Sequence, residues 1–137
     1  MASEISRSAG KFALEGFSEA LSYELASQDI VVKIIEPGGV TSTSFGKRMG
    51  AEHAEDASLT DYDAFITGTN AVFEGLRSAR LASEQEVAQV ILDAATDGTS
   101  QLRYVATQDI LPLVEARRET SEQEYIALMR SRFLPRS

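Results

Sequence analysis

The sequence predicts an α/β protein in which a helical crossover joins two parallel strands. Two short runs rich in β-branched and aromatic residues, 30–36 and 101–106, are typical of strands. Segments with helical periodicity lie between and around them. A strand, a crossover that contains a helix and a second strand form a parallel pair with a right-handed connection. The 137 residues suit one domain, 1–137, and we find no interdomain linker.

The first predicted helix runs from about Ser8 to Ser27. Its large apolar side chains recur at spacings of three and four: Leu14, Phe17, Leu21 and Leu25. Gly16 and Ala20 form a flat stripe beside them, which would let another backbone come close. Gly10 and Gly16 each weaken a helix by about 1 kcal/mol relative to alanine. The two glycines are easier to understand if something packs tightly against them, which the sequence alone does not show.

The run 30–36 (IVVKIIE) predicts a buried strand that stops at Pro37, because proline cannot donate to a strand ladder. A polar, irregular stretch follows, and apolar residues between 62 and 76 suggest one or two short helices. We treat 41–80 as a helical insert. Its aromatic residues fit packing better than substrate recognition.

Two capping boxes mark the starts of later helices, at Ser83 with Glu86 and at Ser121 with Glu124. The first of these helices ends at Gly98, a natural C-terminal stop. The run 101–106 (QLRYVA) predicts the second strand. A final helix reaches about Phe133.

Composition excludes several classes of protein. Lys and Arg number 13 and Asp and Glu number 21, so the formal charge is −8 and the overall field does not attract nucleic acid or anionic lipid. No apolar run is long enough for a membrane helix. Cysteine is absent and His53 is the one histidine, and the acids near it match no calcium loop, so we predict no metal site. We expect a cytoplasmic protein without nucleic-acid or membrane partners, because the first residues also lack a signal-peptide core.

Two strands are few for such a fold, since an ordinary sheet has about five or six. A parallel pair needs cover on both faces, and an unpaired strand edge recruits other strands. We therefore expect either a homo-oligomer or a part of a larger reading frame that lacks its N-terminal half.

Several segments carry a resemblance to a known family. Residues 11–21 (KFALEGFSEAL) followed by 32–40 (VKIIEPGGV) resemble the short-chain dehydrogenases/reductases, in which a Tyr-x-x-x-Lys helix precedes a strand that ends in Pro-Gly. Residues 83–88 (SEQEVA) and 103–105 (RYV) look like that family's last helix–strand unit. The resemblance runs from about Ser8 to Phe133 and covers only the C-terminal half of the family's fold. It implies a partial Rossmann-like sheet and NAD- or NADP-dependent oxidoreduction of a carbonyl or an alcohol.

The resemblance also implies site residues. Lys11 takes the place of the lysine that binds the nicotinamide ribose and lowers the pKa of the catalytic tyrosine. The alternative is a surface lysine that pairs with Glu15 one helical turn later.

The segment Pro37, Gly38 and Val40 corresponds to the one that lies over the nicotinamide, with the backbone at Val40 meeting the carboxamide. A hydroxyl at Ser42 would meet the pyrophosphate. The alternative for this segment is an ordinary turn at the end of a strand.

This sequence departs from the family pattern in two respects. It has no Gly-x-x-x-Gly-x-Gly phosphate turn, and the positions of the family's catalytic serine and asparagine lie upstream. The tyrosine position is Arg7, whose guanidinium stays protonated, has no acceptor and repels Lys11. Tyr23 is no substitute, since it lies about 18 Å from Lys11 along a helix, and Tyr62 lies in the insert.

Two interpretations follow. In the first, the chain is a short-chain dehydrogenase-like oxidoreductase that is truncated and inactive alone, and does not bind NAD or NADP by itself. In the second, it is a non-catalytic remnant that serves as an association module. The flat stripe of Gly16 and Ala20 suits the second interpretation, because the equivalent helix of the family often packs in a dimer interface.

Overall fold

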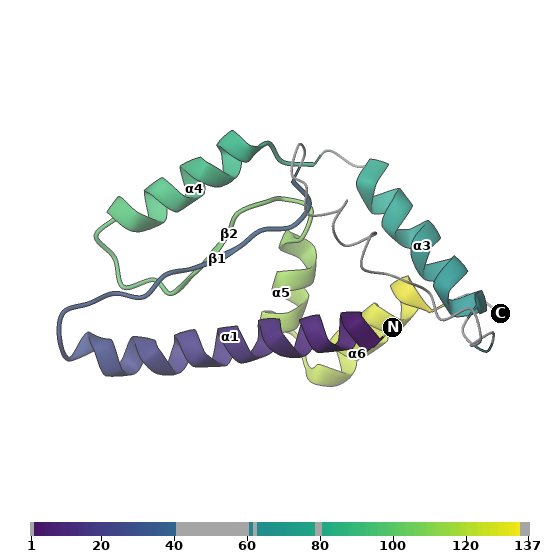
Figure 1. The fold of residues 1–137 in the computed structure, drawn as a ribbon, viewed down its shortest axis with the longest axis horizontal. Coiled ribbons are helices and arrows are strands. Elements are labelled where there is room, and N and C mark those ends of the chain that lie inside the picture. The colour runs from purple at the N-terminus through teal and green to yellow at the C-terminus, as the bar shows by residue number, and fades with distance from the viewer. Residues whose placement is uncertain (1, 41–60, 62, 79–80, 135–137) are drawn as a thin grey trace.

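The computed structural model describes residues 2–40, 61, 63–78 and 81–134. The helices and strands follow in the order α1 (Ala2–Ala26), β1 (Ile34–Glu36), α3 (Asp63–Ser78), α4 (Glu84–Thr96), β2 (Arg103–Val105), α5 (Leu111–Glu119) and α6 (Glu122–Phe133). Figure 1 shows α1 and α4 on opposite sides of the two strands, with α5 beyond the strands' carboxyl ends. Within the described part, no helix has the length and apolarity that a membrane span requires.

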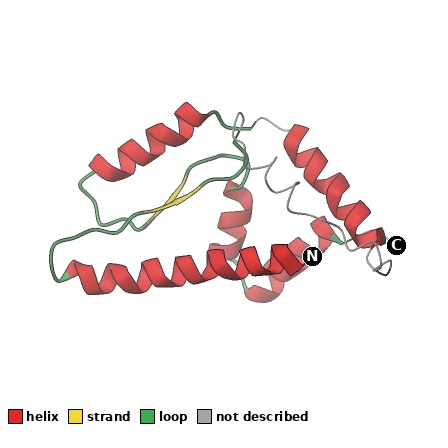
Figure 2. Ribbon diagram, in the orientation of Figure 1, coloured by secondary structure: helices red, strands yellow, loops and turns green. Residues whose placement is uncertain are grey.

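The two strands pair in parallel, with Ile34 opposite Arg103 and Glu36 opposite Val105. They are the yellow segments of Figure 2, and the connection between them includes α3 and α4. The predicted α/β class with a two-stranded parallel sheet is thereby confirmed. Both strands are shorter than expected, because the ladder covers only three residues of each.

Helix α1 begins at Ala2, earlier than the apolar periodicity indicated, and is tied to the sheet by charge. Arg103 of β2 donates from Nε to Glu15 at 3.1 Å and from Nη2 to Glu19 at 2.5 Å. These charge-assisted bonds fix the helix against the strand that is most distant from it in the sequence.

The predicted apolar interior is largely uncovered. Among the described residues, the buried ones are Ala94, Ala106 and Thr107. Phe12 is 72% exposed and Phe17 63% exposed, so the apolar face of α1 is not a core face over this stretch.

The expected burial of the first strand is wrong as well. Ile30 and Val31 lie outside the ladder and are half exposed, and the residues of β1 are intermediate in burial. A parallel pair is normally buried by helices on both faces. Among the described residues, this two-stranded sheet has too few neighbouring elements to be buried on both faces.

No close packing is found at Gly10 and Gly16 among the described residues. A Cβ added at either position would have no neighbouring atom within 4 Å. The glycines of α1 therefore make no close approach to the rest of the described fold.

Both predicted capping boxes are present. The hydroxyls of Ser83 and Ser121 accept from the backbone amides of Glu86 and Glu124, and those carboxylates accept from the amides of the two serines. Gly98 follows α4 with φ of +67°, the left-handed conformation expected of a glycine that stops a helix.

Helix α5 was not predicted. It begins after Ile110 with Pro112 in its first turn, where a missing amide costs nothing. Only one helix, α3, occupies the described part of the insert, where one or two were expected. Residues 41–60, which include the predicted irregular stretch, lie outside the described residues.

Candidate functional site at the carboxyl ends of the strands

The turn that follows β1 and the loop that follows β2 are bound to each other. Ligands of open α/β sheets bind beyond the carboxyl ends of the strands, which makes this edge the place to look for a site. The amide of Gly38 donates to Oγ1 of Thr107 at 2.7 Å, and the amide of Gly39 donates to Oδ2 of Asp109 at 2.8 Å. Two side chains of one loop thus bind two consecutive amides of the other.

Glycine is needed in this turn because other atoms occupy the space of a side chain. A Cβ at Gly38 would lie 2.5 Å from both Oδ1 of Asp109 and Cγ2 of Ile110. At Gly39 it would lie 2.5 Å from Cδ2 of Leu81. The turn and the loop are therefore packed at contact distance.

Val40 extends this edge by a parallel bridge to Ala82. The amide of Ala82 donates to the carbonyl of Gly39 at 3.1 Å. The Gly39 carbonyl and the Val40 amide belong to one planar trans peptide group and point in opposite directions. The Val40 amide therefore points away from Ala82.

A further contact connects α5 to the same edge. Arg118 of α5 donates from Nη2 to Oε2 of Glu36, the last residue of β1, at 2.6 Å. The arginine is 41% exposed and the glutamate 21%. The loop that holds the turn is thus fixed at both ends, by β2 and by α5.

The predicted site residues fall into three groups. Pro37, Gly38 and Val40 all lie at this edge. Lys11 lies on α1, is exposed, and among the described residues forms no hydrogen bond or ion pair with the turn. Ser42 lies outside the described residues.

The alternative role of Lys11, a pair with Glu15, is not found in the described part of the chain. Glu15 pairs instead with Arg103. Arg7 lies in α1 one turn before Lys11, so the tyrosine position of the resembled family is helical.

The described residues fit only one end of a nicotinamide dinucleotide. The Val40 amide, which points away from Ala82, can donate to the oxygen of a carboxamide. The amides of Gly38 and Gly39, however, are already used within the protein. No glycine-rich turn occurs in the described ranges to receive a pyrophosphate, so the dinucleotide as a whole does not fit.

A second polar cluster, missed from the sequence, lies beside the start of β1. Lys33 Nζ donates to Oδ1 of Asp97 at 3.0 Å and to the Tyr104 hydroxyl at 2.7 Å, and the Tyr104 hydroxyl donates to Asp97. The Tyr104 hydroxyl and the backbone amide of Thr99 hold the pKa of Asp97 well below its usual range. The cluster joins the end of α4 to both strands. One hint of this cluster is present in the sequence: Lys33 lies within an otherwise apolar run and on the same face of the predicted strand as Ile35.

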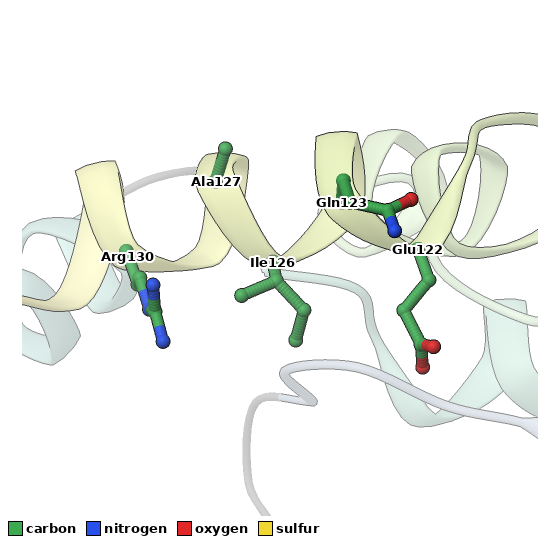
Figure 3. Close-up of a pocket in the computed structure, with 5 residues that line it drawn as sticks. All are labelled: Glu122, Gln123, Ile126, Ala127 and Arg130. Carbon is green, nitrogen blue, oxygen red and sulfur yellow. The ribbon is translucent and has the colours of Figure 1, made fainter.

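A hollow on α6 is unrelated to this edge. It has a volume of about 300 Å³ and is lined by residues of α6 alone: Glu122, Gln123, Ile126, Ala127 and Arg130. Figure 3 shows Ile126 between the side chains of Glu122 and Arg130. A hollow on one helix holds no converging catalytic groups. The described ranges also contain no group of three or more His, Asp or Glu suited to a metal ion.

Comparison with known proteins supplies relatives. No protein-family model matches the chain. An uncharacterized oxidoreductase of Schizosaccharomyces pombe is 33% identical over 122 residues, which is 88% of this chain and 48% of that protein. Human 17-beta-hydroxysteroid dehydrogenase type 1 is 32% identical over 124 residues, 88% of this chain and 38% of its own length. Bovine retinol dehydrogenase 8 is 27% identical over 77% of this chain and 35% of its own length. The chain thus spans half or less of the curated relatives it matches.

Proposed function

Because the chain is a relative of the short-chain dehydrogenases/reductases and corresponds to the C-terminal part of these oxidoreductases, we propose that it is the C-terminal half of a nicotinamide-dependent oxidoreductase fold. In this role it supplies the edge that faces the nicotinamide and the substrate. The reaction is hydride transfer between NAD or NADP and a carbonyl or an alcohol. The names of its relatives, a hydroxysteroid and a retinol dehydrogenase, support an alcohol–carbonyl substrate pair.

The single observation that carries the proposal is the turn after β1. Gly38 and Gly39 are bound by the loop after β2, and the Val40 amide points away from Ala82. These bonds hold the turn in one conformation. The bonds support a prearranged binding edge.

We further propose that the isolated chain performs no hydride transfer. Arg7 stands at the tyrosine position, and a guanidinium neither gives up nor accepts a proton near neutral pH. Position 7, one helical turn before Lys11, therefore offers no phenol whose pKa Lys11 would lower. A second polypeptide segment has to supply the phosphate turn and the proton donor.

Nucleotide titration of the 137-residue chain tests the proposal. NADH and NADPH fluorescence is expected to stay unchanged by the chain across the micromolar range, because the described edge offers nothing for the pyrophosphate. A full-length short-chain dehydrogenase serves as the positive control. Saturable micromolar binding would overturn the claim that this half does not hold the cofactor alone.

A second candidate function is association without catalysis, and the exposed face of α1 favours it. Phe12 and Phe17 are largely exposed beside Gly16 and Ala20, whose small side chains let another backbone approach. In this alternative the chain is a cytoplasmic homo-oligomer without nucleic-acid or membrane partners. Light scattering after size exclusion tests this candidate, because an oligomer has a mass above the 14.9 kDa of a monomer.

A further inference from the structure

The loop after β2 contains a carboxylate whose position calls for an explanation. Oδ2 of Asp109 accepts from Gly39, while its Oδ1 is buried and has no hydrogen-bond partner among the described residues. Burying an unpaired carboxylate oxygen costs free energy. The solvation of its own carboxylate therefore does not explain why Asp109 lies here.

We propose that Asp109 is the positioning residue of the turn after β1: its carboxylate holds the amide of Gly39, and this holds Val40 so that its own amide points away from Ala82. Gly39 is held on both sides, since its amide binds Asp109 and its carbonyl binds the Ala82 amide. Val40 follows directly, so its orientation is set by these two bonds. This inference rests on the proposed function, because Val40 is the residue that would meet the nicotinamide.

Two other features of the structure favour Asp109 as the group that positions the turn. Gly38 leaves the space that the carboxylate occupies, since a Cβ there would lie 2.5 Å from Oδ1. The Arg118–Glu36 pair holds α5, and with it the loop, against the end of β1. Thr107 acts on the neighbouring amide of Gly38 and not on Gly39.

Amide hydrogen exchange measured by NMR on the full 137-residue chain tests the inference residue by residue. Asp109→Ala is expected to speed exchange of the Gly39 amide by roughly tenfold, because a hydrogen bond to a charged acceptor is lost. Asp109→Asn keeps an oxygen acceptor and is expected to stay within roughly threefold of the wild type. Thr107→Val is expected to speed Gly38 more than Gly39.

The control is Gln108→Ala, which changes an exposed neighbour in the same loop. It is expected to leave both glycine amides unchanged, and circular dichroism checks that each variant is folded. Equal Gly39 exchange in wild type and Asp109→Ala would overturn the inference, as would failure of Asp109→Asn to restore protection in a folded variant. No nucleotide enters these measurements. Their failure is therefore distinct from micromolar NADH binding, which would overturn the proposed function instead.

Discussion

Lys33 and Tyr104 meet beside the start of β1, where Nζ of the lysine lies 2.7 Å from the phenol oxygen and 4.9 Å from the centre of the ring. They are 71 positions apart in the sequence. Asp97 binds both of them and closes the cluster. These three side chains hold the end of α4 to the sheet, in a fold of which few described residues are buried.

The cluster predicts a dependence of stability on acid. The pKa of Asp97 is lowered in the folded state, chiefly by the Tyr104 hydroxyl. A carboxyl with a depressed folded pKa contributes stability above its unfolded pKa, and loses it as the pH falls toward the folded pKa. Asp97→Asn is therefore less stable than wild type at pH 7. The difference in the free energy of unfolding narrows once the pH falls below 3.8, the ordinary pKa of an aspartate.

Urea unfolding at a series of pH values measures that difference. Tyr104→Phe removes the main cause of the lowered pKa, so its difference from wild type is expected to narrow over the same acid range. A stability difference for Asp97→Asn that is the same at pH 7 and in acid would contradict the assignment.

The same glycine-to-alanine substitution is expected to have opposite effects on stability at Gly16 and at Gly38. Gly16→Ala places a methyl group in open space on α1 and is expected to stabilise by about 0.5–1 kcal/mol, since glycine is a poor helix residue. Gly38→Ala places it 2.5 Å from Asp109 and Ile110 and is expected to destabilise by about 1–3 kcal/mol.

Thermal unfolding of the two variants at equal concentration is the measurement. The pair is its own control because the chemical change is identical. If Gly38→Ala unfolds at or above the wild-type temperature, the close packing of turn and loop is not as described. A destabilising Gly16→Ala would instead indicate that another copy or segment covers α1.

The exposed face of α1 predicts that the chain associates. Phe17 is 63% exposed, and a large apolar side chain in water favours contact with another surface. Phe17→Ser is expected to lower the mass measured by light scattering. Ile126→Ser changes an exposed apolar residue on α6 and is expected to leave that mass unchanged. Equal masses for Phe17→Ser and wild type would argue against α1 as the contact.

The starts of α4 and α6 and the sheet class were predictable because their signals are local. Ser83 and Ser121 mark their helices by a four-residue pattern, and the apolar runs indicate strands without any knowledge of the partner. Helix α5 was missed because it lacks a capping side chain and a strong apolar stripe. Its one local signal was Pro112 in the first turn.

The geometry of the site was predictable only in part. The turn at 37–40 could be placed at the end of the first strand, but its partners Thr107 and Asp109 lie about 70 positions later and depend on strand register. Burial was overestimated for Ile30 and Phe17, because periodicity shows which face is apolar and not whether anything covers it.

Steady-state hydride transfer by the purified 137-residue chain tests the central claim most directly. The assay follows oxidation of NADH and NADPH with a panel of ketones, and reduction of NAD and NADP with the corresponding alcohols. The account predicts no turnover above the rate without protein, because Arg7 supplies no proton and the described edge holds no pyrophosphate. Sustained turnover that scales with the concentration of this chain alone would contradict it.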